Sequence, residues 1–251
     1  MNEIQLTGIC SEMARLMIKY GAEIYRVEDT ISRICHAYGH SEAAIYATPA
    51  NFIITVKDKN SVPYTDSKSI SGRDTNLDRV GKLNELSRFI CSEKPEAEVI
   101  FHRIEQIKER KTYSPALIYI SYFITGAAFT VFFGGGAMEA LFGGVLGLVI
   151  NFISVRLKLI NASAFLNAVV CSAAISVIAV ALSHTGLIKS FDKMIIGASM
   201  ALVPGVALTN CMRDFISGDF ISGIYTLTEA VLIAVGMAVG AGSAVAAVIK
   251  F

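Results

Sequence analysis

Two patterns of hydrophobic and polar positions divide the chain close to residue 112. In the first 112 residues, apolar positions recur at helical spacing or in short runs between charged residues, which is typical of a soluble domain. Beyond that point the apolar runs are long and carry few charges, as in segments that cross a membrane. The pattern predicts an N-terminal domain over residues 1–112 and a transmembrane domain over residues 113–251.

The N-terminal part contains signals for both helices and strands. Helical spacing of apolar residues predicts helices over residues 4–20, 27–38, 77–90 and 97–108. Short β-branched or apolar runs predict strands over residues 44–48 and 52–57, and residues 61–75 leave room for one more. Together these elements predict an α+β domain of about 110 residues, which is large enough to form its own core.

The apolar part divides into five predicted spans, each near the length that crosses about 30 Å of hydrocarbon. They cover residues 116–133, 140–155, 165–183, 194–212 and 220–248. The second is short, with Glu139 and Arg156 at its edges, and tilt or local thinning of the bilayer would accommodate it. Two GxxxG pairs predict close packing of helices, namely Gly143 with Gly147 and Gly236 with Gly240. The predicted fold class is a membrane protein with an all-α transmembrane bundle of about five helices and an N-terminal cytosolic α+β domain.

The charge distribution supports the same division and gives an orientation. Of the 43 Lys, Arg, Asp and Glu residues, 32 lie in the first 112 positions. Lys and Arg near the span ends favour a cytosolic N-terminus and an external C-terminus, because cytosolic loops are enriched in them. The cytosolic set is Lys108, Arg110, Lys111, Arg156, Lys158 and Arg213, and the external set is Lys189, Lys193 and Lys250.

Several functional classes find no support in the sequence. A net charge of +1 without a long basic run gives no indication of nucleic-acid binding. The five cysteines lack CxxC spacing, which indicates free thiols rather than a disulfide framework. His36 and His40 have no Glu or Cys to complete a ligand set, so we expect no metal and no cofactor. Without a nucleophile–base pair or a phosphate-binding loop, an enzyme is not expected.

The main candidate site begins with a break in an apolar helix. Pro204 lacks an amide proton and its ring crowds the carbonyl of Met200, so the fourth span is expected to kink or unwind there. Gly205 adds conformational freedom at the same point. Broken helices of this kind expose backbone groups to a substrate cavity in many transporters. The alternative is an ordinary proline kink whose backbone groups are satisfied by neighbouring helices.

Polar side chains follow this break. Asn210 is suited to hydrogen-bond a substrate or another helix. Arg213 suits a helix C-terminus, whereas Asp214 does not and needs a partner such as Arg213 or a residue of the cytosolic domain. Asp219 follows a Ser-Gly pair and fits a helix N-cap as well as a site. Glu229 follows Asp219 by ten residues, about 15 Å along a helix, which places it near mid-bilayer. There it is suited either to proton coupling or, when protonated, to a structural hydrogen bond.

A second candidate motif, GAEIYRVEDTI, occupies residues 21–31 of the N-terminal domain. It starts at Gly21 and places Arg26, Glu28 and Asp29 within one turn at the start of a helix. Acidic residues there are explained by the positive end of the helix dipole, with Arg26 paired to a carboxylate. The alternative is a regulatory or substrate-gating contact that faces the membrane domain.

With these residues, the chain resembles the threonine/serine exporter (ThrE) family, and in length its shorter, YjjP-like members. The resemblance covers nearly the whole chain and rests on two groups of residues. They are Gly21, Ala22, Arg26, Glu28 and Gly39, and then Pro204, Gly205, Asn210, Arg213, Asp214, Gly218, Asp219, Gly223, Glu229 and Ala230. It implies a multi-pass exporter of small polar metabolites in the inner membrane, with the Asn210–Glu229 region along the translocation path.

The resemblance also implies partners and leaves the substrate open. Long family members carry a second block of spans, so we expect a separately encoded YjjB-like membrane subunit, a homo-oligomer, or both. Threonine and serine are the expected substrates, and a two-component dicarboxylate (succinate) exporter is an alternative. A non-transporting regulatory subunit is another. The expected mechanism is alternating access around Pro204, driven by the proton gradient or the membrane potential.

Overall fold

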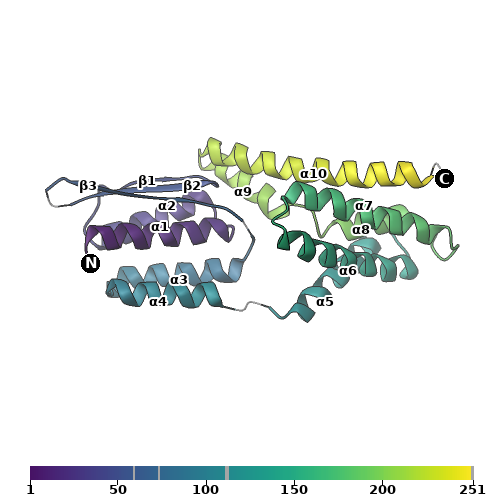
Figure 1. The fold of residues 1–251 in the computed structure, drawn as a ribbon, viewed down its shortest axis with the longest axis horizontal. Coiled ribbons are helices and arrows are strands. Elements are labelled where there is room, and N and C mark those ends of the chain that lie inside the picture. Colours follow the sequence, from purple (N-terminus) through teal and green to yellow (C-terminus); the bar gives the residue numbers. More distant parts are fainter. Residues whose placement is uncertain (59, 73, 111–112, 250–251) are drawn as a thin grey trace. The chain divides into compact units, whose positions relative to one another are not determined.

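The computed structural model describes residues 1–58, 60–72, 74–110 and 113–249 (Figure 1). Its contacts divide the chain into two compact units. The first comprises Met1–Thr112 and Thr209–Thr226, and the second comprises Tyr113–Leu208 and Leu227–Phe251. Residues 209–226, which the sequence assigns to the transmembrane domain, therefore group with the N-terminal part. The predicted boundary at residue 112 lies outside the described residues, as do Lys111 and Lys250 of the orientation argument.

Within its described residues, the N-terminal segment of the first unit contains four helices and three strands, close to the ranges that the sequence predicts. They are α1 (Glu3–Lys19), α2 (Ile24–Ala37), β1 (Ala44–Ala47), β2 (Asn51–Lys57), β3 (Pro63–Ser69), α3 (Leu77–Glu93) and α4 (Ala97–Glu109). The third strand falls inside the 61–75 segment. Asn2 and Gln5 form a capping box at α1, and the Asn76 side chain caps α3, so side-chain chemistry sets both starts.

The strands form an antiparallel sheet in the order β1-β2-β3, with α1 and α2 beneath it and α3 and α4 below them (Figure 1). Successive β2 side chains alternate between the two faces, and Phe52, Ile54 and Val56 are fully buried in the core. Between the sheet and the α3–α4 layer, α1 buries Ile9, Met13 and many of its other residues. One continuous core therefore joins the three layers and fixes the turn between α1 and α2.

The second unit is built from apolar helices. The remaining helices of the chain are α5 (Pro115–Phe132), α6 (Ala137–Leu159), α7 (Ala164–Ser183), α8 (Phe191–Ser199), α9 (Gly205–Ile216) and α10 (Phe220–Ile249). Among the described residues, four are long and apolar enough to cross a membrane: α5, α6, α7 and α10 up to Ala247. The chain is thus mostly helical and has the helices of a membrane protein.

Two of the five predicted spans differ from the observed helices. The fourth, 194–212, is interrupted, because α8 ends at Ser199 and α9 begins only at Gly205. This interruption contains Pro204, where the sequence predicts a kink or an unwound turn. The second, predicted as a short span over 140–155, is the 23-residue helix α6. Glu139 and Arg156, which the prediction took as the limits of the span, lie inside the first and last turns of α6. An acidic residue is favourable near the N-terminus of a helix and a basic residue near its C-terminus, because of the helix dipole.

Glycines allow the helices of the second unit to approach closely. A Cβ atom on Gly147 would lie 2.2 Å from the Tyr122 carbonyl oxygen, and one on Gly143 or Gly197 would lie 2.2 Å from Thr130 Oγ1. The backbones of α5, α6 and α8 are therefore in direct contact, as is typical of helix packing in lipid. Larger side chains at these positions would separate the helices.

The second GxxxG pair, on α10, packs against α7. A Cβ atom on Gly236 would lie 3.0 Å from the Phe165 carbonyl oxygen, and one on Gly240 would lie 2.3 Å from that of Val169. Residue numbers thus rise in the same direction along both helices. Over this contact α7 and α10 run parallel.

Candidate functional site

The two motifs that the sequence singles out meet in the first unit. The Asn210 side-chain amide donates a hydrogen bond to the Gly21 carbonyl oxygen at 3.3 Å. One turn further along α9, Arg213 Nη1 forms an ion pair with Glu23 Oε1. These contacts join positions 189 and 190 residues apart in the chain. The C-terminal half of α9 is therefore attached to the turn between α1 and α2.

A left-handed glycine shapes this turn. Gly21 has a φ of +90°, a region that residues with a side chain rarely adopt. The Gly21 amide donates to the Ile18 carbonyl at 3.1 Å, and the Ala22 amide donates to the Met17 carbonyl at 2.9 Å, which closes the end of α1. The chain then reverses and presents Glu23 at the start of α2. Gly21 thus serves both the turn and the contact with Asn210.

Residues before and within α3 hold the turn from behind. The Asn76 amide donates to the Tyr20 carbonyl at 3.0 Å, and Arg79 Nη1 donates to the Tyr20 hydroxyl at 2.8 Å. The Arg79 guanidinium also lies over the Tyr20 ring, 4.9 Å from its centroid. Sequence reasoning missed Tyr20 and Arg79, because nothing in their spacing, 59 residues apart, indicates that they meet.

Glu23 is the most informative residue that the sequence analysis did not select. It occupies the N-cap position of α2 but makes no side-chain capping bond, so helix-entry chemistry does not explain it. Its side chain is only 11% exposed. Oε1 pairs with Arg213, while Oε2 is buried and has no hydrogen-bond partner in the part of the chain that the structure describes. The available signal was its position inside the 21–31 motif.

The other charged residues of this motif have separate contacts. Glu28 Oε1 accepts a hydrogen bond from the Ala47 amide at 2.9 Å, which ties α2 to β1. Burial raises the pKa of the Glu28 carboxyl group, the Ala47 bond opposes this, and the charge of Asp219 raises it further. Arg26 is half exposed, with Nε 3.7 Å from Glu23 Oε2. Asp29 forms an exposed ion pair with Arg33.

The two aspartates of the candidate site lie near the junction of α9 and α10, Asp214 in the last turn of α9 and Asp219 directly before α10. Gly218 adopts a φ of +84° after α9, and the Asp219 amide donates to the Asp214 carbonyl at 2.9 Å. Asp219 Oδ1 then accepts from the Ser222 amide at 3.2 Å, so Asp219 has the N-cap role that the sequence offers as one interpretation. Asp214 is buried, with 2% of its surface exposed.

The structure places the predicted site residues in two groups. Gly21, Arg26 and Glu28 share the first unit with Asn210, Arg213, Asp214 and Asp219. Pro204, Gly205 and Glu229 belong to the second unit. Pro204 lies in the interruption between α8 and α9, Gly205 starts α9, and Glu229 lies on α10. The first group is where the structure brings distant motifs into direct contact.

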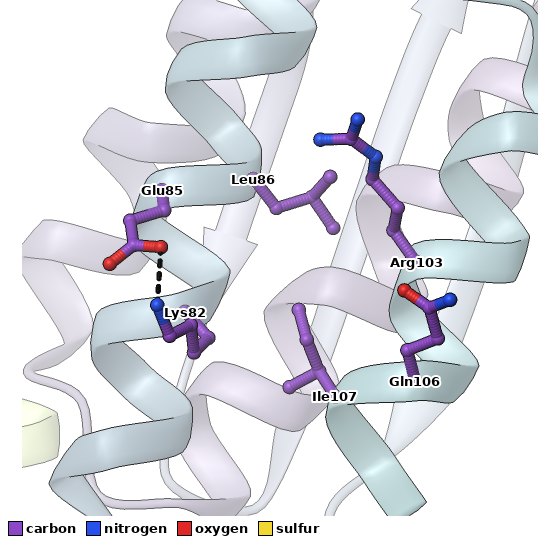
Figure 2. A pocket seen from close by; sticks show the side chains of 6 residues that line it. All are labelled: Lys82, Glu85, Leu86, Arg103, Gln106 and Ile107. Atoms are coloured by element: carbon purple, nitrogen blue, oxygen red, sulfur yellow. Dashed lines mark hydrogen bonds and ion pairs between the residues drawn. The ribbon is translucent and has the colours of Figure 1, made fainter. Parts of the chain in front are cut away.

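A shallow groove between α3 and α4 lies elsewhere in the first unit (Figure 2). Its volume is about 290 Å³, and its lining residues are Lys82, Glu85, Leu86, Arg103, Gln106 and Ile107. Lys82 Nζ pairs with Glu85 at 2.7 Å, and the Arg103 guanidinium stacks 3.7 Å from the Phe89 ring centroid. The charged groups of this groove are thus engaged with one another or with the ring. None of the predicted site residues lines it.

Comparison with known families identifies the class of protein. The family model for threonine/serine exporters, ThrE, matches residues 8–248, nearly the whole chain. The chain belongs to the threonine/serine exporter (ThrE) family. The predicted resemblance is confirmed, and the matched range includes every residue of the candidate site. Comparisons with curated proteins and with solved structures gave no match. Its family and its apolar helices together place this ThrE protein in a membrane.

Proposed function

We propose that this ThrE protein exports small polar metabolites, most directly threonine and serine, as a transporter or as a subunit of one. The observation that carries the proposal is the contact of Asn210 and Arg213 with Gly21 and Glu23. In a family of exporters, a charged and hydrogen-bonded connection between the helix after the Pro204 break and the N-terminal unit is suited to gate a translocation path. In this proposal the 21–31 motif has the gating role that was the alternative interpretation of its sequence.

Alternating access requires a rigid group of helices and a hinge about which other helices move. The close contacts of Gly197 with Thr130 and of Gly143 with Gly126 support a rigid group of α5, α6 and α8. Residues 200–204 follow directly and lack regular helix, so a change of backbone angles there is less costly than within a helix. We place the hinge at these residues, with Pro204 and Gly205 at its end.

The parallel arrangement of α7 and α10 supports a fifth crossing. Two parallel spans start on the same side of a membrane, so the chain between them has to return across it. Between them lie α8 and α9, of 9 and 12 residues, and α9 continues from residue 209 into the first unit. We propose that this interrupted segment is the return. Five crossings put the termini on opposite sides, and the distribution of Lys and Arg then favours a cytosolic N-terminus and an external C-terminus.

The energy source in this proposal is the proton gradient or the membrane potential. Glu229 lies on α10, ten residues after Asp219, in a helix that is long and apolar enough to cross a membrane. An ionisable group within such a segment is costly and commonly functional. If Glu229 carries the proton, Glu229→Gln abolishes the dependence of efflux on external pH, whereas an unchanged pH dependence contradicts proton coupling through this residue.

The decisive experiment is efflux of labelled threonine, serine and succinate from proteoliposomes, with and without a YjjB-like subunit. Efflux of threonine or serine by this chain alone supports a self-sufficient exporter, while efflux only with the second subunit makes it an obligate component. Efflux of succinate alone supports the dicarboxylate alternative. Absence of efflux in every condition contradicts the proposal and favours a regulatory role.

A further inference from the structure

The buried oxygen of Glu23 calls for a hydrogen-bond donor. Buried carboxylate oxygens are almost always hydrogen-bonded, because removing a charge from water is costly unless partners compensate it. Glu23 Oε2 has no such partner in the described part of the chain, and Arg26 Nε lies 3.7 Å from it. That separation exceeds the range of a hydrogen bond. Among the described residues, the hydrogen bond to this carboxylate therefore comes from Arg213, and Arg26 contributes a longer-range charge.

Arg213, on the same carboxylate, has hydrogen-bond donors that its ion pair with Glu23 does not use. Its ion pair with Glu23 uses Nη1, and its side chain is 47% exposed. A guanidinium has five N–H donors in a planar fork that matches a carboxylate. A ligand that approaches from solvent therefore meets the guanidinium of Arg213 first and reaches the buried Glu23 Oε2 once the ion pair opens.

We propose that Glu23 and Arg213 form a head-group site for an α-amino acid. The ligand's ammonium group donates to Glu23 Oε2, and its carboxylate accepts from the guanidinium of Arg213. This inference rests on the proposed function and assigns its recognition step to two residues. Glu23 and Arg213 come from the two motifs that the fold brings together.

Charge balance makes the site selective for a zwitterion. When a ligand separates Glu23 from Arg213, each side chain loses its countercharge, and an uncompensated, partly buried charge is strongly unfavourable. A zwitterion supplies one countercharge to each. A dicarboxylate compensates Arg213 but places its negative charge beside Glu23, and a simple amine compensates Glu23 but leaves Arg213 bare.

The same exchange connects binding to movement. Without ligand, the Glu23–Arg213 pair holds α9 to the start of α2. A bound zwitterion occupies both partners, so that only contacts such as Asn210 with Gly21 remain from this connection. A ligand shifts a conformational equilibrium when it binds one state more tightly than another. Substrate binding therefore favours release of α9, the step that a gate requires.

The test is equilibrium binding to the full-length protein in nanodiscs, with L-threonine, L-threoninol, 3-hydroxybutyrate and succinate as probes. Threoninol lacks the carboxylate, and 3-hydroxybutyrate lacks the ammonium group. We expect threonine to bind at least about tenfold more tightly than each of the others, because each leaves one protein charge unpaired. Equal affinity for threonine and threoninol, or tighter binding of succinate, overturns the assignment.

Single variants test the two residues directly. Glu23→Gln and Arg213→Gln should each weaken threonine binding by at least about tenfold, because each removes one charge-assisted contact. Arg33→Gln alters an exposed ion pair on the same helix, outside the 21–31 motif, and should leave the affinity unchanged. Unchanged threonine affinity in both site variants, with efflux by the wild type intact, overturns this site but leaves the proposed function standing. Absence of threonine binding and efflux in the wild type contradicts both.

A charge exchange separates recognition from structural support. The double variant Glu23→Arg with Arg213→Glu preserves an ion pair between α2 and α9. If the pair is only structural, the double variant restores both thermal stability and threonine binding. The proposal expects stability to recover while threonine binding stays at least about tenfold weaker, because the ligand's two charges now meet their partners in reversed positions. Full recovery of binding overturns it.

Discussion

Arg79 Nη1 donates a hydrogen bond to the Tyr20 hydroxyl at 2.8 Å and so holds the residue that precedes Gly21. The same guanidinium donates from Nη2 to the Arg110 carbonyl at 3.0 Å, at the end of α4. Arg110 in turn pairs with Asp78 at 2.9 Å. One side chain therefore joins the turn of the candidate site to the last described residues of the N-terminal segment. A chain of contacts of this kind makes the position of Gly21 depend on α3 and α4.

Tyr20→Phe tests this support without removing the ring from the core. The variant keeps the stacking with Arg79 but loses the hydrogen bond, which contributes about 0.5–1.5 kcal/mol to stability. We expect a small fall in melting temperature of the detergent-solubilised protein and a weaker apparent affinity for exported substrate, at nearly unchanged maximal efflux. Arg79→Lys should have a larger effect on both, because lysine cannot reach Tyr20 and Arg110 together. Wild-type affinity in Arg79→Lys would exclude a positioning role.

Gly21→Ala tests the left-handed turn. With φ at +90°, alanine is strained whatever space surrounds it, and the cost is about 1–3 kcal/mol. The expected result is a lower melting temperature together with reduced efflux, because the carbonyl that accepts from Asn210 moves. Gly8→Ala, in the middle of α1 with no atom close to its would-be Cβ, is the matched control and should not reduce stability. Equal behaviour of the two variants would show that the turn tolerates a side chain.

Glu12 makes stability depend on pH. Burial alone would raise the pKa of its carboxyl group, but hydrogen bonds from Arg15 and Lys108 outweigh burial and lower it to about 2, below the usual 4.5. The stabilisation that Glu12 provides is therefore complete above pH 4.5 and is lost as the pH falls from about 4.5 to about 2. Because the pair is partly solvent-screened, we expect it to contribute on the order of 1 kcal/mol.

The measurement is the melting temperature of the wild type and of Glu12→Gln as a function of pH. The difference between them should be constant from pH 7 to 5 and shrink towards zero below pH 4. Glu85→Gln, which alters the exposed pair with Lys82, serves as a control and should show little difference at any pH. A wild-type advantage at pH 2.5 as large as that at pH 7 contradicts the ion-pair explanation.

Gly197→Val tests the close contact between α8 and α5. A Cβ atom at this position would lie 2.5 Å from the Thr130 backbone nitrogen, so the helices have to separate. Overpacking of this kind costs about 1–3 kcal/mol, and we expect lower thermal stability and loss of efflux. Gly242→Val on α10, where no atom lies within 4 Å of the added Cβ, should fold and transport normally. Normal efflux by Gly197→Val contradicts a rigid α5–α6–α8 group.

The sequence predicts most local features because local physics determines them. Apolar periodicity locates α1 to α4. The missing amide of Pro204 predicts the interruption inside the fourth span. Gly218 indicates the end of α9, and Asp219 indicates the start of α10. The predicted length of the second span was wrong. Charged residues such as Glu139 and Arg156 fit inside the terminal turns of a helix as well as outside them. Local rules alone do not separate those two cases.

The meeting of distant segments is what the sequence could not predict. Spacing shows which residues share a helix face, but not that Arg213 pairs with Glu23 across 190 positions. Of the two partners expected for Asp214, Arg213 pairs with Glu23. A partner in the N-terminal domain stays a prediction. The fold also groups residues 209–226 with the N-terminal segment rather than with the apolar helices around them. Such a grouping depends on tertiary packing.

That grouping has a consequence for how the protein is made. The N-terminal segment leaves the ribosome about 100 residues before α9 does, an interval of roughly 5–20 s at usual rates of synthesis. During this time Glu23 has no Arg213, and Arg26, 3.7 Å away, is the remaining partner of its carboxylate at the α1–α2 turn. The unit is completed only after the apolar helices between its two segments have been inserted. Assembly of the head-group site therefore reports that insertion has succeeded, and chains with misinserted helices would keep an open turn that quality-control proteases can reach.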